Sequence, residues 1–191
     1  ELRSPLAAIR LQAQGLRRPQ AEGERAAAVG QLNAAVERAI TLAEQLLLLA
    51  REEGRGPAQA SEPVDLDALV SEAIGEALPA ARQRGIDLGL ARGDAARVRG
   101  DGESLRVLLR NLLENAIKYT PQAGQVDVSV FPEQGRVQLL VEDSGPGIPD
   151  AERERVFDRF YRSPQARAEA PGSGLGLALV RAIAQRHGAT G

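Results

Sequence analysis

The chain has 191 residues and no cysteine, which excludes a disulfide scaffold and any thiolate metal site. Its 24 basic and 26 acidic residues leave a formal net charge of −2, and the arginines are scattered, so we expect no nucleic-acid partner. Hydrophobic residues make up 43%, ample for a core, yet no apolar run approaches the roughly 18 residues that cross a bilayer, so no direct membrane contact is expected.

The first 53 residues carry two apolar seams with the three- and four-residue spacing of helices that pair lengthwise. The seams are Leu2, Leu6, Ile9, Ala13 and Leu16, then Leu32, Ala35, Ala39, Leu42, Leu46 and Leu49. Two short amphipathic helices do not bury a full seam by themselves. We therefore expect residues 1–53 to form a helical hairpin that pairs with a second copy as a dimeric four-helix bundle. A monomeric hairpin resting on a second domain is the alternative.

A run of small and helix-breaking residues, 54–63, predicts a linker. The rest of the chain predicts three helices, at 66–84, 103–119 and 175–184, and four strands, at 86–90, 98–100, 126–131 and 136–142. This order suits a two-layer α/β sandwich with helices on one face of a mixed sheet. The predicted fold class is α+β, with the all-α hairpin at 1–53 and the α/β domain at 64–191.

Three polar residues share one face of the predicted helix 103–119. Asn111, Asn115 and Lys118 follow each other at i, i+4 and i+7, opposite an apolar face. An amide oxygen is a suitable ligand for a magnesium ion that takes its other ligands from phosphate and water, and lysine supplies the countercharge. The stripe therefore indicates a triphosphate with magnesium, and an ordinary solvated helix face is the alternative.

The strand 136–142 ends in the turn Asp143-Ser-Gly-Pro-Gly147. Gly145 and Gly147 allow the backbone to turn tightly and to approach a ligand. Asp143 is placed to accept a hydrogen bond from an exocyclic amine such as that of adenine, worth about 1.5 to 3 kcal/mol. A solvated Asp-Gly turn is the alternative.

Three glycines, Gly172, Gly174 and Gly176, run directly into the last apolar helix. Glycines that open a helix present free N–H groups and the positive end of its dipole, which favour phosphate. The segment is not a P-loop, because no Gly-Lys-Ser or Gly-Lys-Thr follows. With the two preceding clusters, in this order and spacing, it predicts an ATP site.

These clusters resemble the N, G1 and G2 boxes of bacterial sensor histidine kinases. The segment FDRFYR at 157–162 resembles the F box of that family, and Glu1-Leu-Arg-Ser-Pro5 resembles the residues that follow the phosphoacceptor in its H box. The resemblance covers nearly the whole chain. It implies autophosphorylation of a histidine with ATP and Mg²⁺, transfer to an aspartate of a cognate response regulator in two-component signal transduction, and a homodimer.

The resemblance also implies roles for single residues. It places adenine on Asp143, magnesium on Asn115, and Asn111 on the metal and phosphate side. It gives phosphate contacts to Lys118, Tyr119 and the segment from Gly172 to Gly176, with Leu175 inside it. Arg159 and Arg162 of the F box would reach the γ-phosphate beside a lid at 163–171, Glu1 is the candidate general base, and Ser4 occupies a position linked to phosphatase activity.

By the same resemblance, the acceptor histidine would come immediately before Glu1. The one histidine of the sequence, His187, resembles the family's His-Gly after the last helix and is expected to cap or pack there. The sequence therefore predicts a cytoplasmic fragment, of a parent anchored in the inner membrane, that does not autophosphorylate. The family's ATP domain continues with two further strands after this His-Gly, so its C-terminal edge is expected to be cut short here.

The rival hypothesis is an ATPase that uses nucleotide as a conformational clamp, as gyrase-like and Hsp90-like proteins do on the same fold. Those families carry a glutamate four residues before the metal-binding asparagine, where this chain has Asn111. An amide does not take a proton from water, so phosphoryl transfer is favoured over hydrolysis. Glu114, about 60° around the helix from Asn111, is the alternative base.

Overall fold

The computed structural model describes residues 7, 9–11, 13–14, 22–54, 62–164 and 172–189. The chain divides into two compact units, Glu1–Ala50 and Arg51–Gly191. The predicted domain limits, with a linker at 54–63, stay a prediction. The last two residues of that segment, Glu62 and Pro63, belong to strand β1, Glu62–Asp65.

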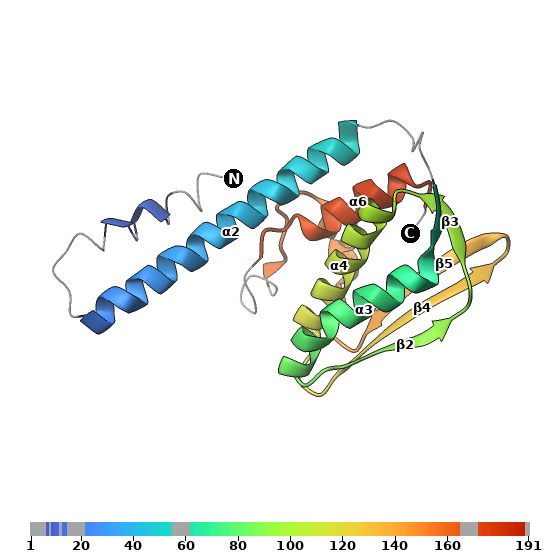
Figure 1. The fold of residues 1–191 in the computed structure, drawn as a ribbon, viewed down its shortest axis with the longest axis horizontal. Helices are drawn as coiled ribbons and strands as arrows, with labels where there is room; N and C mark the ends of the chain where they lie inside the picture. Colours follow the sequence, from blue (N-terminus) through green and yellow to red (C-terminus); the bar gives the residue numbers. More distant parts are fainter. Residues whose placement is uncertain are drawn as a thin grey trace. The chain divides into compact units, whose positions relative to one another are not determined.

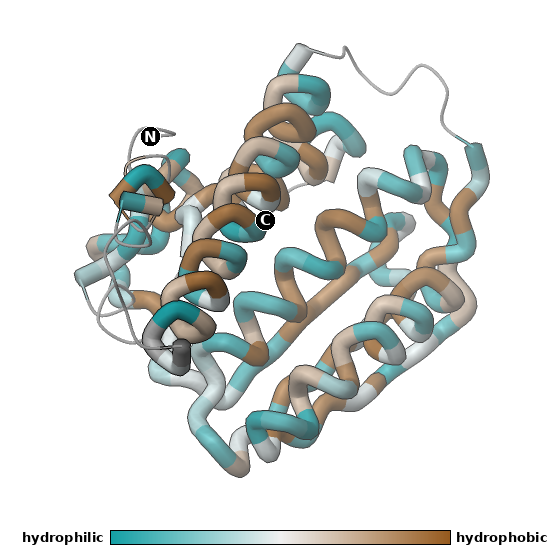
Figure 2. The backbone as a smooth tube through the Cα atoms, turned by 60° about the vertical axis from the view of Figure 1, so that its left-hand side comes forward, coloured by the Kyte–Doolittle hydropathy of each residue, from teal (hydrophilic) through white to brown (hydrophobic). Residues whose placement is uncertain are grey.

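The first unit is dominated by α2, Glu22–Gly54, whose last turn from Arg51 onward belongs to the second unit. The predicted seam is the least exposed stripe of this helix, with Ala35 and Leu49 fully buried and the other members half-buried. A second apolar stripe is exposed and consists of Val29, Val36, Ile40 and Leu47. Apolar and polar segments alternate along the helices (Figure 2).

The second unit has two layers (Figure 1). One layer is a three-stranded sheet of β2, Asp87–Gly93, β4, Gln125–Glu133, and β5, Arg136–Asp143, in the order β2-β4-β5. Strand β4 is parallel to β2 and antiparallel to β5, so the predicted mixed sheet is confirmed. Strand β3, Arg97–Gly100, pairs with β1 in a separate two-stranded sheet that sequence reasoning missed.

The β4–β5 hairpin is closed by a two-residue turn. Gln134 and Gly135 have φ of 50° and 79°, and Glu133 pairs with Arg136. Two successive positive φ values match the twist of the flanking strands, which sets the register of the hairpin. That register places Asp143 at the end of β5, opposite Val126.

Two helices, α3, Leu66–Gln83, and α4, Gly102–Tyr119, pack on the sheet, and α6, Gly176–Arg186, packs against α4. Each of the first two begins at an aspartate cap: Asp65 accepts from the Ala68 N–H, and Asp101 accepts from those of Glu103 and Ser104. The core between helices and sheet includes Val70, Leu109, Val126, Val128 and Val130.

Helix α4 is buried on more than its predicted apolar face. Leu105, Leu108, Leu109 and Ala116 are buried as expected, but Leu112 is only half-buried, and Leu113 is 1% exposed. The difference arises because α4 packs against α3 on one side and against α6 on another. A single apolar stripe therefore underestimates how much of α4 the fold covers.

Candidate functional site

The polar stripe of α4 faces α6 and the glycines before it. A Cβ placed on Gly176 would lie 3.0 Å from Oδ1 of Asn111 and 3.6 Å from Nδ2 of Asn115. A Cβ on Gly172 would lie 2.6 Å from Nζ of Lys118. The structure thus brings together the first and third predicted clusters, which lie far apart in sequence. A side chain at Gly172 or Gly176 would displace Lys118 or Asn111 from this position.

Asn111 is buried rather than solvated, at 6% exposure. Its Nδ2 donates to the Val107 carbonyl at 2.8 Å, which orients Oδ1 toward α6. Among the described residues, no hydrogen bond reaches this oxygen, the amide of Asn115 or the ammonium of Lys118. The polar atoms of the stripe are therefore available to a ligand, which argues against an ordinary solvated face.

The first turn of α6 has no side-chain cap, since Leu175 occupies the N-cap position. The first N–H groups of a helix lack partners within the helix, and the positive end of its dipole favours anions. The side chain of Leu175 is fully buried and its backbone N–H donates to the Ser173 hydroxyl at 3.2 Å, so a nucleotide would meet the N–H groups that follow Leu175. A phosphate at this turn would lie beside Lys118 and the two asparagines.

The turn after β5 holds Asp143 in place. Its Oδ1 accepts from the Gly145 N–H at 2.9 Å, while the carboxylate is exposed. A Cβ on Gly145 would lie 2.9 Å from the Tyr119 carbonyl oxygen, so this turn closes directly onto the end of α4. Gly147, with φ of 72°, completes the turn. The Oδ2 atom of Asp143 has no partner in the described part of the chain and can accept from an amine.

The F-box segment is tied to the glycines that open α6. The Phe160 N–H donates to the Gly174 carbonyl at 2.8 Å, with Phe160 at φ 62° and Gly174 at φ 72°. Arg159 forms an ion pair with Glu53, and Nε of Arg162 lies 3.9 Å from a Cβ placed on Gly172. The rest of the predicted lid, residues 165–171, lies outside the described residues.

Two other predicted site residues, Glu1 and Ser4, also lie outside the described residues. Sequence reasoning missed Arg84, whose Nη2 donates to the carbonyls of Lys118 at 3.1 Å and Thr120 at 3.4 Å and so holds the end of α4. The sequence around Arg84 contains no pattern that predicts this contact. Sequence reasoning also missed Ser144. Its hydroxyl accepts from the Gln125 N–H at 2.8 Å and so fixes the start of the Asp143 turn.

In the described part of the chain, no three His, Cys, Asp or Glu side chains gather as a metal site. The donor set between α4 and α6 is instead two amides and an ammonium, a set that suits a metal ion delivered together with phosphate oxygens. The described helices include none with the length and apolarity needed to span a membrane.

Two family models match the chain. Residues 1–55 match the His Kinase A (phospho-acceptor) domain, and residues 100–191 match the histidine kinase-, DNA gyrase B- and HSP90-like ATPase family. The second match contains every predicted nucleotide contact, and the first contains Glu1 and Ser4.

Similar proteins agree with both matches. The sensor protein kinase PmrB of Pseudomonas aeruginosa is 38% identical over 187 residues, which cover 98% of this chain and 39% of PmrB. A structure of the mycobacterial sensor histidine kinase MprB is 38% identical, with a TM-score of 0.56 over 67% of this chain and 80% of that one. The histidine kinase AdeS of Acinetobacter baumannii is 26% identical, with a TM-score of 0.76 over 97% and 85%. The chain therefore spans about two fifths of the length of a curated relative such as PmrB.

Proposed function

The chain belongs to the sensor histidine kinases, and on that premise we propose that it binds Mg-ATP between α4 and α6 and directs the γ-phosphoryl group to a histidine. One observation carries the proposal: the stripe of Asn111, Asn115 and Lys118 lies against the glycine-built, uncapped start of α6. Amide and ammonium groups that face the first N–H groups of a helix without a side-chain cap form a site for a polyphosphate.

The nucleotide would extend from the Asp143 turn to the first turn of α6. Asp143 would accept from the exocyclic amine of adenine through Oδ2, because Gly145 occupies Oδ1. Lys118, Tyr119 and the N–H groups between Gly172 and Gly176 would hold the phosphates. Arg159 and Arg162, which directly precede the lid at 163–171, would approach the γ-phosphate once the ion pair between Arg159 and Glu53 breaks.

Magnesium fits the same place. Asn115 offers one neutral oxygen ligand, Asn111 supports the phosphate side, and phosphate oxygens and waters would complete the coordination. The ion would neutralise charge on the transferring group. Asn111 also bears on the rival hypothesis of an ATPase clamp, because its amide donates to Val107 and has no proton-accepting role toward water.

The acceptor we propose is a histidine in the register of the resemblance, immediately before Glu1. In the transfer step, a ring nitrogen of that histidine forms a bond to the γ-phosphorus and the bond from this phosphorus to the β–γ bridging oxygen breaks, so ADP leaves. Glu1 takes the ring proton, and the phosphoryl group then passes to an aspartate of a response regulator. His187 is unsuited to the role, since both of its ring nitrogens have partners in the second unit.

We also propose that the chain acts as a homodimer in the cytoplasmic part of a membrane-anchored sensor. The exposed stripe of α2, formed by Val29, Val36, Ile40 and Leu47, supports the dimer, because a second copy would remove these side chains from water. Leu47→Glu, at a side chain 63% exposed, should convert the dimer to a monomer in sedimentation experiments. Gln31→Glu, which adds the same charge at an exposed polar position, should leave the dimer intact, and a monomeric unmodified chain would contradict the proposal.

The kinase proposal is tested with γ-labelled ATP and Mg²⁺ on two proteins. The chain as given should bind Mg-ATP by calorimetry without acid-labile labelling. The same chain with a histidine placed before Glu1 should become labelled, and Glu1→Gln in that background should slow labelling about hundredfold without changing ATP affinity. Label on His187, or release of inorganic phosphate at the same rate with and without the added histidine, would refute it.

A further inference from the structure

A compact polar cluster lies at the end of the α4–α6 pair that the nucleotide does not reach. Arg186 donates from Nη1 to Oε2 of Glu52 at 2.6 Å and to the Ser104 hydroxyl at 3.3 Å, and from Nη2 to Oδ2 of Asp101 at 3.3 Å. The single hydrogen of the Ser104 hydroxyl has two acceptors within range, Oε1 of Glu52 at 3.0 Å and Oδ2 of Asp101 at 3.1 Å. Glu52 belongs to the second unit, and its side chain is 1% exposed against 9% for Arg186.

His187 adds a second attachment between the two helices. Its Nε2 accepts from the Asp101 N–H at 3.0 Å, while Nδ1 lies 2.8 Å from the Ile183 carbonyl oxygen. With Nε2 as the acceptor, Nδ1 is the donor to the Ile183 carbonyl. A Cβ on Gly100 would lie 2.7 Å from Cδ2 of His187, which shows how closely the ring fits against the chain before α4.

The charged groups of the cluster stabilise each other. The pKa of Arg186 is raised, above all by its hydrogen bond to Glu52. Burial by itself would raise the pKa of Asp101, but hydrogen bonds from Ser104 and Arg186 outweigh burial and lower it. Replacing a buried ion pair by apolar residues is often neutral for stability, and in some proteins the role of such a pair is to fix the register of the elements it joins. Register is therefore the property on which to test this cluster.

The spacing of the two helices connects the cluster to the nucleotide site. Asn111 lies ten residues after Asp101, and Arg186 lies ten residues after Gly176. Both intervals correspond to about 15 Å of helix. Because Asp101 contacts Arg186 and Asn111 faces Gly176, the antiparallel helices are matched at both ends. A slip of α6 by one residue would move its first N–H groups by about 1.5 Å, enough to lose a hydrogen bond.

We propose that Arg186 and His187 are positioning residues for the nucleotide phosphates, because they hold α6 in the register that aligns its first turn with Asn111 and Asn115. The inference rests on the proposed function. It predicts weaker binding of the phosphates and unchanged binding of adenine, since Asp143 is carried by the end of β5 and not by α6.

Adenosine and Mg-ATP separate these effects. Arg186→Lys keeps the charge but loses the fork that joins three partners. It should weaken Mg-ATP binding about tenfold and adenosine binding less than twofold. His187→Ala should act in the same direction, and His187→Gln, whose amide oxygen can accept from the Asp101 N–H, should restore most of the loss. Gln185→Ala, on the exposed side of the same turn, should change neither affinity.

Affinities are measured by calorimetry for Mg-ATP and by NMR titration for adenosine, with thermal melting of every variant. Equal losses for the two ligands would show a purely structural role and overturn the inference, as would unchanged Mg-ATP affinity in both Arg186→Lys and His187→Ala. If Arg186→Lys does not fold, the comparison of His187→Ala with His187→Gln decides. A wild-type chain that binds adenosine but not Mg-ATP would instead refute the proposed function.

Discussion

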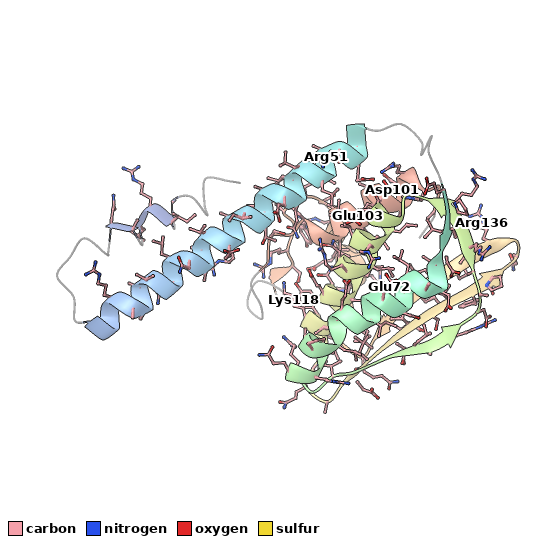
Figure 3. All side chains as sticks on the ribbon, in the orientation of Figure 1. Arg51, Glu72, Asp101, Glu103, Lys118 and Arg136 are labelled. Carbon is pink, nitrogen blue, oxygen red and sulfur yellow. The ribbon has the colours of Figure 1, made fainter. Side chains whose placement is uncertain are left out.

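Polar residues gather at both ends of the α4–α6 pair, but they bond mostly to each other at one end and have few partners at the other. At one end, Asp101, Ser104, Arg186 and His187 bond to each other and to backbone groups. At the other end, around Asn115, the stripe faces glycine backbone and has few partners among the described residues. Asp101 and Lys118 are labelled near opposite ends of α4 in Figure 3.

The difference shows how a ligand site is distinguished from a structural cluster. Native folds pair nearly all buried polar groups, so the cluster around Arg186, in which Nε of Arg186 is left without a partner but the other groups bond to each other, needs no ligand to explain it. At the other end, Oδ1 of Asn111 has no hydrogen-bond partner among the described residues and faces a helix start without a side-chain cap, an arrangement that favours a ligand. Four variants test this contrast, from the largest expected effect to the smallest.

Gly174→Ala should have the largest effect, on nucleotide binding. Gly174 has φ of 72°, and a Cβ there would lie 2.7 Å from the Phe160 carbonyl carbon, so the backbone at the neck of the lid has to move. We expect at least a hundredfold loss of Mg-ATP affinity by calorimetry, about 2.7 kcal/mol. Gly135→Ala is the control, because its φ of 79° carries similar strain with no atom within 4 Å. Equal losses in both variants would attribute the effect to strain alone.

Asp101→Ala should have the next largest effect, on stability. The substitution removes the N-cap bonds to Glu103 and Ser104 and one partner of Arg186. We expect a loss of about 2 kcal/mol in urea unfolding. Asp65→Ala removes a cap with a single bond at 3.3 Å and should cost about 1 kcal/mol. If the two variants lose the same stability, the cluster adds nothing beyond the cap.

Asn115→Ala should affect binding with little change in stability. Its amide has no partner among the described residues, so its loss leaves nothing unpaired. We expect Mg-ATP affinity to fall about tenfold and metal-free ATP affinity less than twofold, since the proposed partner is the ion. Calorimetry with and without magnesium measures both, and Glu114→Gln, at an exposed neighbour, serves as control. Equal losses in the two conditions would make Asn115 a structural residue.

Much of the fold could be predicted because its elements carry local patterns. The apolar periodicity of α3 and α4 and the alternation in β4 and β5 place each helix and strand to within a few residues. Strand β1 escaped prediction because Glu62 and Pro63 are poor strand formers, and only the pairing with β3 makes them extended. Strand propensity is a local property, so it does not indicate a pairing partner that lies more than 30 residues away in the chain, as β3 does.

The candidate site could be predicted in part for the same reason. The glycines and asparagines are unusual enough in sequence to indicate a ligand, and the structure brings Gly176 and Asn111 together. The cluster of Arg186 and Asp101 could not be foreseen, because a salt bridge between residues far apart in the chain leaves no local pattern. Arg84 escaped for that reason too.

The smallest expected effect is a pH dependence at the satisfied end. Asp101 has a lowered pKa in the folded chain, so at acidic pH the unfolded chain binds the proton more readily and stability falls. Its contribution should be complete above the ordinary aspartate pKa of about 3.9 and should be lost as pH falls through the lower folded value. Asp101→Asn keeps a good N-cap but removes the charge that faces Arg186. In urea titrations, the wild type should exceed this variant by about 1 kcal/mol from pH 7 to pH 5, and the gap should narrow below about pH 4. A gap that stays constant down to pH 3 would mean that the carboxylate charge contributes nothing and that the cluster is held by neutral hydrogen bonds alone. The two ends of the α4–α6 pair would then differ in the arrangement of their neutral hydrogen bonds and not in the pairing of their charges.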